Sequence, residues 1–288
     1  MMALAVEPVL DRIRRAYHGT VMVMKGPEAA ARHLHPGTRW FRDLDLLVDD
    51  PFAAQRALVE AGFVKGPREQ DYAEAQHLVP LVYPGLPLVV ELHRRPNVPC
   101  LIPSPPVQEI LGMAVPSMTG VRGVVAPAAP VHALLLAAHS WTDRPVARLV
   151  DLVDVVAVLG EGNRDEAARL AHEWGWESLW HTTLGLADAV LAGEGQPLAL
   201  RTWARHFDGA RERTVLEEHV ARVTAPAWTV PRAQAPRAVT AAVARTAARR
   251  PGERWPDKFR RSGLALRHAL TAQSAHAKAV DTTPGRHP

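Results

Sequence analysis

The sequence predicts an α/β (α+β) protein in which a domain with a mixed sheet is followed by a helical domain. Two observations carry this prediction. Short β-rich runs at residues 20–24, 43–48 and 87–91 alternate with segments of helical character. From residue 131 onward, apolar residues recur at helical spacing and the β-rich runs cease.

The composition divides the chain into three expected regions. Residues 1–127 should hold the sheet, 128–224 a helical domain, and 225–288 a basic, partly helical region with a disordered end. The last region carries 12 Lys and Arg against 3 Asp and Glu, which gives it a net charge of +9. Because the whole chain has a net charge of +4, the first 224 residues have a net charge of −5. Such a basic region can meet RNA, an acidic peptide or membrane phosphates.

The cysteine content indicates the redox environment in which the protein is expected to work. The single cysteine, Cys100, excludes an intramolecular disulfide and a metal site built on cysteines. A reduced, cytoplasmic setting is therefore expected. No apolar stretch approaches the ~20 residues of a membrane span, so a soluble protein without a membrane partner is expected.

The first β-rich run ends at a glycine turn. Lys25 and Gly26 follow this run, and a helix-compatible segment then opens with proline, a favoured first residue of a helix. A strand, a glycine and a helix N-terminus form a place where backbone N–H groups can meet phosphate. Lys25 is one of only four lysines beside 30 arginines, and one explanation is that this position needs a compact ammonium that arginine would not replace. A salt bridge to Glu28 or Asp45 is the alternative.

Two carboxylates flank a leucine in the next β-rich run. Alternate side chains of a strand share a face, so Asp43 and Asp45 point the same way and Leu44 points to the other face. Two like charges this close repel unless a cation lies between them, and their oxygen atoms suit Mg²⁺. For a bare D-x-D, solvated residues at a strand entry are the plain alternative.

A hairpin brings a third acid to the same sheet. The runs 75–83 and 86–93 flank a Pro-Gly pair, which is typical of a β-turn. An antiparallel pair here extends the sheet and brings Glu91 beside the two aspartates. His77 and His93 are then candidates to face the same site. Three such carboxylates can hold metal ions for in-line phosphoryl transfer.

Together these motifs resemble the uncharacterised bacterial nucleotidyltransferase family of the polymerase-β superfold. That family reads L-K-G, then an arginine four residues before a D-[LI]-D-L-L-V strand, then [DE]-L-H. The matching residues here are Lys25, Gly26, Arg39, Asp43, Asp45, Glu91 and His93. The resemblance implies a polymerase-β-like nucleotidyltransferase domain that uses Mg²⁺ (or Mn²⁺) and a nucleoside triphosphate. It covers the first third of the chain strongly and the helical middle weakly.

The resemblance also implies roles for individual residues. The expected catalytic residues and metal ligands are Asp43, Asp45 and Glu91. The expected nucleotide-binding residues are Lys25, Gly26, Arg39 and Arg42. Two positions depart from the family pattern: Pro27 stands where Ser or Gly often follows the glycine, and Arg42 stands where a small residue often precedes the first aspartate. Arg42 can bind phosphate or cover the strand edge.

The helical middle supplies further candidates. His139 ends the apolar segment 131–139, and Arg148 and Asp151 lie in the segment 147–159, where the family has a histidine and then R-L-x-D-L. An acid on an apolar helix is costly to bury without a partner. Asp151 should therefore pair with His139 or Arg148, or reach the cleft as a general base, and pairing is favoured. The expected acceptor-side residues are His93, His139 and Asp151.

The remaining elements follow from proline, glycine and helical spacing. The predicted elements are a proline-rich connector (97–130) with one short helix (107–113), a surface helix (198–223), an irregular linker (226–236) and two basic helices (237–250 and 258–272).

The expected reaction moves a nucleoside monophosphate from the triphosphate to a hydroxyl of an unidentified acceptor, a small molecule, sugar or peptide. One alternative is a toxin-like enzyme that modifies tRNA, with the basic C-terminal region as its RNA footprint. Another is a catalytically inactive module that binds nucleotide or protein. Pro27 and Arg42 support the inactive module, and the presence of all three acids argues against it.

Overall fold

The computed structural model describes residues 2–67, 76–142, 144–195, 197–200, 206–207, 209, 211–249 and 252–270. The chain divides into two compact units. Unit 1 comprises Met1–Val98, Ile102–His139 and Val150–Gly175, and unit 2 comprises Pro99–Leu101, Ser140–Leu149 and Trp176–Pro288. The segments 129–139 and 150–173, which follow the sheet and are helical in large part, thus group with it, and the domain boundaries expected at 127 and 224 remain predictions.

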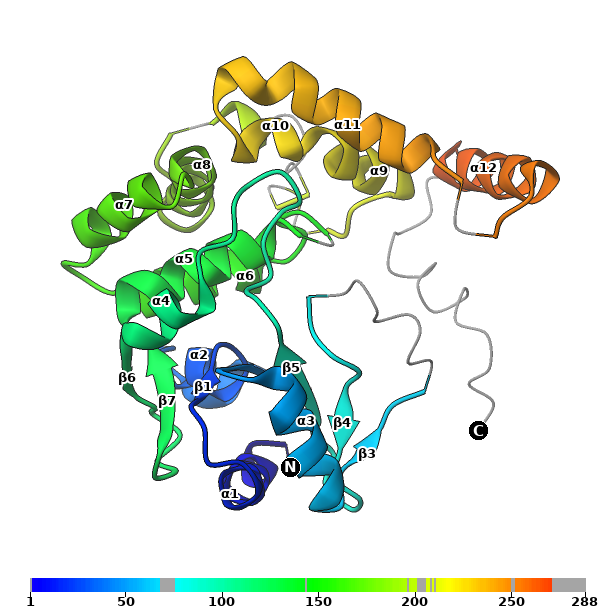
Figure 1. Ribbon diagram of the computed structural model, residues 1–288. Helices are drawn as coiled ribbons and strands as arrows, with labels where there is room; N and C mark the ends of the chain where they lie inside the picture. Colours follow the sequence, from blue (N-terminus) through cyan, green and yellow to red (C-terminus); the bar gives the residue numbers. More distant parts are fainter. Residues whose placement is uncertain are drawn as a thin grey trace. The chain divides into compact units, whose positions relative to one another are not determined.

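A mixed seven-stranded sheet forms the centre of unit 1 (Figure 1). Its strands are β1 (Val21–Val23), β2 (Asp43–Val48), β3 (Val64–Lys65), β4 (Leu81–Val82), β5 (Val89–His93), β6 (Ala114–Pro116) and β7 (Val124–Pro127). Their order is β3-β4-β5-β2-β1-β7-β6. The pairs β2–β5 and β1–β7 are parallel, and all other neighbours are antiparallel. The predicted α/β class with a mixed sheet is confirmed.

One face of the sheet packs on two helices. Leu44 and Leu46 of β2 are fully buried in one hydrophobic core with Leu10 of α1 (Met2–Ala16) and Leu58 of α3 (Pro51–Glu60). Figure 1 shows α1 and α3 beside each other against the sheet. Burial of each such leucine contributes about 1.5–3 kcal/mol. Asp50 caps α3 by accepting from the backbone N–H groups of its first turn, as expected for an N-cap.

The predicted hairpin is present in the described residues. β4 and β5 pair antiparallel with Leu81 opposite Val90, and residues 68–75 lie outside the described part of the chain. The prediction that residues 97–130 form a connector with only one short helix was wrong. This segment contains the predicted short helix α4 (Val107–Gly112), but it also supplies β6 and β7. These strands are three and four residues long and each ends in proline, so the proline content concealed them.

Unit 1 contains further helices. They are α2 (Pro27–Ala31), the short 3₁₀ helix η1 (Pro36–Thr38), α5 (Ala129–Ser140), α6 (Leu149–Leu159) and α7 (Arg164–Glu173). Most residues of α5 are buried, as its continuous apolar sequence predicts. His132 Nε2 of this helix lies 2.6 Å from the backbone carbonyl oxygen of Met24, which directly follows β1. Because a carbonyl only accepts, His132 Nε2 is the donor.

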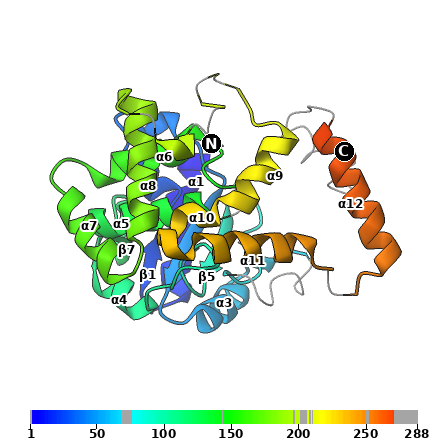
Figure 2. The same cartoon turned by 90° about the horizontal axis from the view of Figure 1, so that it is seen from above.

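Unit 2 consists of helices. They are α8 (Glu177–Ala187), the π turn η3 (Asp188–Ala192), α9 (Val215–Thr224), α10 (Pro226–Thr229), the 3₁₀ turn η5 (Arg232–Gln234), α11 (Ala235–Ala247) and α12 (Trp255–Leu270). Figures 1 and 2 both show α9, α10 and α11 packed side by side. Trp176 and Trp180 are buried, as expected for core aromatics.

Two helix predictions in unit 2 were wrong. The surface helix expected over 198–223 is not continuous: residues 198–200 are helical, residues 211–213 are not, and α9 starts at Val215, where Thr214 and Glu217 form a capping box. Arg213, just before this cap, is buried and donates to Val146 O at 2.8 Å, which holds the chain out of the helix. The linker expected over 226–236 contains α10 and η5, because proline is accepted in the first turn of a helix.

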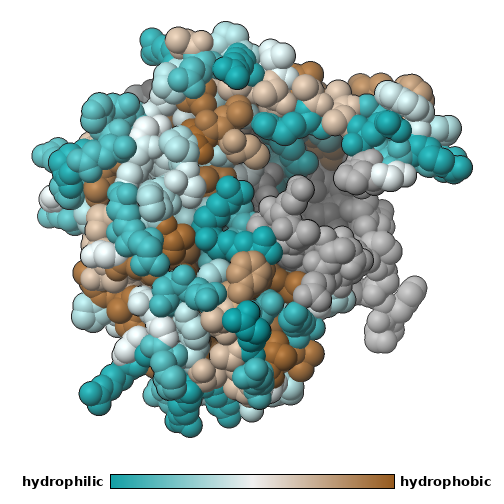
Figure 3. Space-filling model, viewed as in Figure 1, coloured by the Kyte–Doolittle hydropathy of each residue, from teal (hydrophilic) through white to brown (hydrophobic). Residues whose placement is uncertain are grey.

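The two basic helices are present as α11 and α12, and the predicted disordered end lies outside the described residues. Figure 3 shows hydrophilic side chains along α12. Arginines in this helix and just before it have acidic neighbours: Arg254 lies 3.2 Å from Asp257, and Arg261 lies 2.7 Å from Glu253. In the part of the chain that the structure describes, no helix has the length and apolar character needed to cross a membrane.

Candidate functional site

The second face of strands β2 and β5 carries the acids. Asp43 and Asp45 lie opposite to the leucines of β2 that enter the core, as alternation requires. β5 runs parallel to β2, with Asp45 next to Glu91 and Leu47 next to His93. The parallel register therefore brings all four polar side chains to one face of the sheet.

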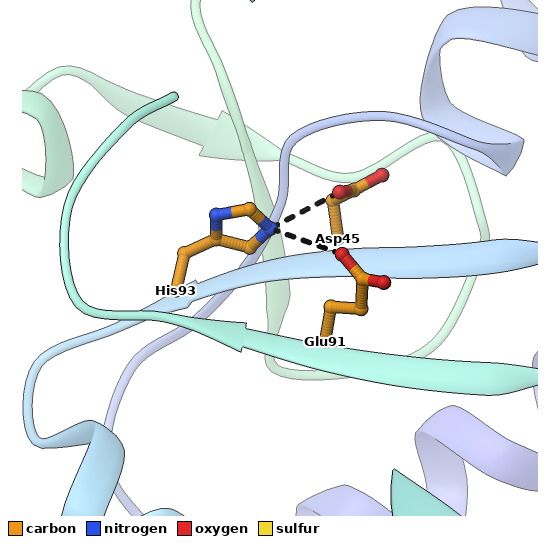
Figure 4. Close-up of side chains that lie close together, drawn as sticks. All are labelled: Asp45, Glu91 and His93. Carbon is orange, nitrogen blue, oxygen red and sulfur yellow. Dashed lines mark hydrogen bonds and ion pairs between the residues drawn. The ribbon is translucent and has the colours of Figure 1, made fainter. Parts of the chain in front are cut away.

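Asp45, Glu91 and His93 form a close cluster, here called the Asp45 cluster (Figure 4). His93 Nε2 lies 3.0 Å from Asp45 Oδ1 and 3.9 Å from Glu91 Oε2. One ligand atom from each residue lies within 4.8 Å of the others. His77 approaches from the segment beside β5, with its Nε2 3.7 Å from Glu91 Oε2. Two carboxylates and an imidazole thus converge on one point.

The Asp45 cluster is buried and incompletely hydrogen-bonded. Asp45 is 4% exposed and His93 is 2% exposed. Asp45 Oδ2 and His93 Nδ1 have no hydrogen-bond partner among the described residues. A buried polar atom without a partner costs about 1–3 kcal/mol. The cluster therefore has acceptor capacity that the fold itself leaves unused.

Electrostatics separate Asp45 from its two acidic neighbours. Burial and the charge of Asp45 raise the pKa of Asp43, and the same two causes raise the pKa of Glu91. Burial alone would raise the pKa of Asp45 as well, but the Lys25 ammonium and the hydrogen bond from His93 outweigh it and hold this pKa below its ordinary value. The three carboxylates thus repel one another, and a bound cation would reduce this repulsion.

Lys25 brings positive charge to the two aspartates and is held by a histidine. Its Nζ lies 2.7 Å from His139 Nε2, and His139 Nδ1 lies 3.0 Å from Asn97 Nδ2. An ammonium only donates, so His139 Nε2 accepts from Lys25. Glu28, one expected salt-bridge partner of Lys25, is buried and accepts from a serine hydroxyl and a backbone N–H elsewhere.

Gly26 has a steric reason to be glycine. Its φ is +60°, and a Cβ at this position would lie 2.7 Å from the carbonyl oxygen of Asp43. Only glycine allows the turn to pack this closely on β2. The turn thus sets Lys25 beside the acids, whether or not its N–H groups also meet phosphate.

Arg39 lies near the acids, but its guanidinium is bound to a residue that sequence reasoning missed. Asp154 of α6 accepts from Arg39 Nε at 3.0 Å and from Nη2 at 2.6 Å. His33 Nε2 lies 2.7 Å from the same carboxylate. The side chains of Arg39 and Asp154 are 7% and 3% exposed. We call this the Asp154 network; it ties the segment before β2 to α6.

The other predicted site residues lie further out. Arg42 is exposed at the entry to β2, with its guanidinium 4.3 Å from the ring centroid of Trp40. Asp151 is buried in the first turn of α6. Asp154, one turn further along α6, is the acid that meets Arg39.

Asp154 and Asn97 were not predicted. The signal for Asp154 was a second acid three residues after Asp151 on a strongly apolar helix, since such an acid needs a partner when buried. Asn97 carried no signal, because it follows β5 in a loop and meets a histidine 42 residues away.

Comparison with protein families identifies the chain. A family model described as "Uncharacterised nucleotidyltransferase" matches residues 5–192, more than half of the 288-residue chain. The chain belongs to this nucleotidyltransferase family. The match confirms the resemblance expected from the sequence motifs, and it spans every site residue from Lys25 to Asp154. Searches of curated proteins and of solved structures gave no significant match.

Members of nucleotidyltransferase families generally use a triphosphate and divalent metal ions. The residues of this nucleotidyltransferase fit a divalent cation. The Asp45 cluster supplies carboxylate and imidazole donors within one coordination sphere, and the buried Asp45 Oδ2 has no other partner among the described residues. Asp43 adds a further carboxylate two residues before Asp45 on the same face.

Proposed function

We propose that the protein transfers a nucleoside monophosphate from a nucleoside triphosphate to a hydroxyl of a small molecule, sugar or peptide in the cytoplasm. The observation that carries the proposal is the pairing of Asp45 with Glu91 on adjacent parallel strands, with Asp43 on the same face and Lys25 acting on both aspartates. Membership of the nucleotidyltransferase family supports the reaction class.

In this proposal Asp43, Asp45 and Glu91 hold the divalent cation, Mg²⁺ or Mn²⁺. When bound, such a cation neutralises phosphate charge and stabilises the transferring group as a Lewis acid. Lys25 binds phosphate oxygens directly. An ammonium has three N–H donors, and the hydrogen bond to His139 uses one of them and fixes the direction of the others. Positioning and electrostatics carry this kind of transfer.

The chemical step is a displacement at the α-phosphorus. The acceptor oxygen forms a bond to this phosphorus, and the bond from the phosphorus to the oxygen that bridges the α- and β-phosphates breaks. Pyrophosphate leaves with the electron pair of that bond. The hydroxyl proton passes to a carboxylate, and Glu91, whose side chain retains 23% exposure, is the proposed acceptor of it.

The contacts refine the proposed acceptor side. His139 is held between Lys25 and Asn97, and His93 contacts Asp45, so we place both on the nucleotide and metal side. Asp151 remains the proposed acceptor-side residue. We likewise propose that Arg39 supports the nucleotide site by holding the segment before β2 through the Asp154 network, and that the exposed Arg42 meets phosphate at the strand entry.

The test is calorimetric binding of each of the four ribonucleoside triphosphates with and without Mg²⁺. It compares the wild type, the Asp43→Asn/Asp45→Asn variant, and an Asp11→Asn control that makes the same change on the exposed side of α1. The wild type and the control should bind a triphosphate only with Mg²⁺, and the double variant should lose this binding. Absence of binding to the wild type at about 100 μM protein contradicts the proposal.

The basic character of α11 and α12 keeps tRNA as the second candidate acceptor. Transfer to tRNA by the full chain should fall steeply between low and moderate salt, because arginine contacts to phosphate release counterions. Transfer to a small neutral acceptor should change little. An inactive binding module would bind the triphosphate without release of pyrophosphate in the presence of any acceptor extract.

A further inference from the structure

His93 adds an imidazole nitrogen to the carboxylates of the proposed metal site. We propose that Asp45, Glu91 and His93 together bind a divalent transition-metal ion, so that the site prefers Mn²⁺ to Mg²⁺. The inference concerns the same site as the proposed function and refines the identity of its cation. It adds His93 to the three acids of the proposed function, because His93 has a ligand atom within 4.8 Å of those of Asp45 and Glu91.

The distances within the Asp45 cluster match a coordination sphere. Ligand atoms about 2.1 Å from one ion lie about 3–4 Å from one another. His93 Nε2 lies 3.0 Å from Asp45 Oδ1 and 3.9 Å from Glu91 Oε2. Figure 4 shows this nitrogen directed toward both carboxylates. The three donors therefore need little rearrangement to share an ion.

Burial provides a second and independent observation. Asp45 and His93 are more than nine-tenths buried, yet Asp45 Oδ2 has no hydrogen-bond partner among the described residues. Buried carboxylates are normally paired or bound to metal. The backbones of both residues are fixed in the parallel β2–β5 ladder, so the donors are preorganised.

The donor set determines which ion is preferred. Mg²⁺ favours oxygen ligands and loses its water reluctantly, whereas imidazole is a good ligand for transition metals. Two carboxylates with one imidazole therefore shift the preference from Mg²⁺ toward Mn²⁺ and later metals of the series. The competing role for His93 is a hydrogen-bond donor that only orients Asp45, which would affect Mg²⁺ and Mn²⁺ alike.

The test measures metal binding to the full-length protein without nucleotide. Mg²⁺ and Mn²⁺ are titrated separately into the wild type, His93→Gln and a His35→Gln control, in which an exposed histidine is changed in the same way. The wild type and the control should bind Mn²⁺ at least about tenfold more tightly than Mg²⁺. His93→Gln should bring the two affinities within about threefold of each other. Pulsed electron paramagnetic resonance of bound Mn²⁺ should show coupling to an imidazole ¹⁴N nucleus, and His93→Gln should lose it.

Several results would overturn the inference: no metal binding, equal affinities in the wild type, or bound Mn²⁺ without nitrogen coupling. If His93→Gln fails to fold, the nitrogen coupling in the wild type and its loss in Glu91→Gln through loss of the ion decide the question. The outcomes are separable from those of the proposed function. Nitrogen-coupled Mn²⁺ without triphosphate binding sustains the inference and rejects the function, and Mg²⁺-dependent triphosphate binding without nitrogen coupling does the reverse.

Discussion

Unit 1 contains two buried groups that combine carboxylate with histidine, and their electrostatics are opposite. In the Asp154 network, one carboxylate accepts two guanidinium hydrogen bonds from Arg39 and contacts His33. In the Asp45 cluster, the Asp45 carboxylate accepts one hydrogen bond, from His93, and has Glu91 beside it. Its second oxygen, Oδ2, has no hydrogen-bond partner among the described residues.

The difference distinguishes a charge-balanced structural group from a candidate cation site. The Asp154 network balances its charge within the fold, so it needs no ligand to be stable. The Asp45 cluster concentrates negative charge that its histidine and Lys25 offset only in part, which is the condition that favours a bound cation. Residue types alone would not distinguish the two groups, because both combine aspartate, histidine and a nearby cation.

The largest expected effect tests the structural role of the Asp154 network. Arg39→Gln leaves Asp154 buried without its cation, so the free energy of unfolding should fall by about 3 kcal/mol. Urea denaturation measures this change. Adding Asp154→Asn to Arg39→Gln should restore part of the loss. If Arg39→Gln keeps full stability and weakens triphosphate binding instead, Arg39 is a phosphate ligand and the contrast between the two groups is wrong.

A histidine beside the Asp154 network gives the next effect. Burial, with the charges of Arg32 and Arg39 against that of Asp154, lowers the pKa of His132 to about 4. In the unfolded chain the value is about 6.5, so its contribution is complete above that pH and is lost as the pH falls toward 4. Stability should fall by about 2 kcal/mol between about pH 7 and pH 5 through this group.

Denaturation of the wild type and His132→Gln at both pH values isolates this effect, because His206 of unit 2 also has its pKa lowered to about 4, by burial and by Arg213. His132→Gln should retain the part of the pH-dependent loss of stability that is due to His206 and should lack the part that is due to His132. Equal pH dependence in the two proteins would show that His132 does not stay neutral in the fold.

Substitutions of Asp43 and Asp45 should change the stability of the metal-free fold in opposite directions, by less than the changes above. Because its pKa is raised, Asp43 disfavours the metal-free fold when ionised, so Asp43→Asn should stabilise that state by about 1 kcal/mol at neutral pH. Lys25 and the hydrogen bond from His93 lower the pKa of Asp45, so Asp45→Asn should destabilise the metal-free fold. Thermal unfolding with the metal chelated measures both changes. Shifts of the same sign would contradict this division of charge.

Local pattern was enough to predict which polar side chains of β2 and β5 share one face of the sheet. The alternation in Asp43-Leu44-Asp45 fixed the faces of β2, and the run that ends at Glu91 and His93 fixed those of β5. The glycine turn placed Lys25 just after the end of β1, the strand that pairs with β2. These are relations within an element or between neighbouring elements, where spacing determines direction.

Partners far apart in the sequence could not be predicted in this way. Lys25 meets His139 across 114 residues, and Arg39 meets Asp154 across 115. Spacing shows which face of a helix a residue occupies, but it does not show which helix packs there. β6 and β7 were missed for a different reason, since strands of three and four residues give too little alternation to recognise.

The most direct test of the central claim is to locate the ion. Crystals of the full chain grown with Mn²⁺ and a non-hydrolysable triphosphate would be measured at a wavelength where manganese scatters anomalously. The account predicts an anomalous peak about 2.2 Å from oxygen atoms of Asp45 and Glu91 and from His93 Nε2, with the triphosphate beside it and Lys25 on its phosphates. Bound triphosphate with no manganese between these side chains would contradict it.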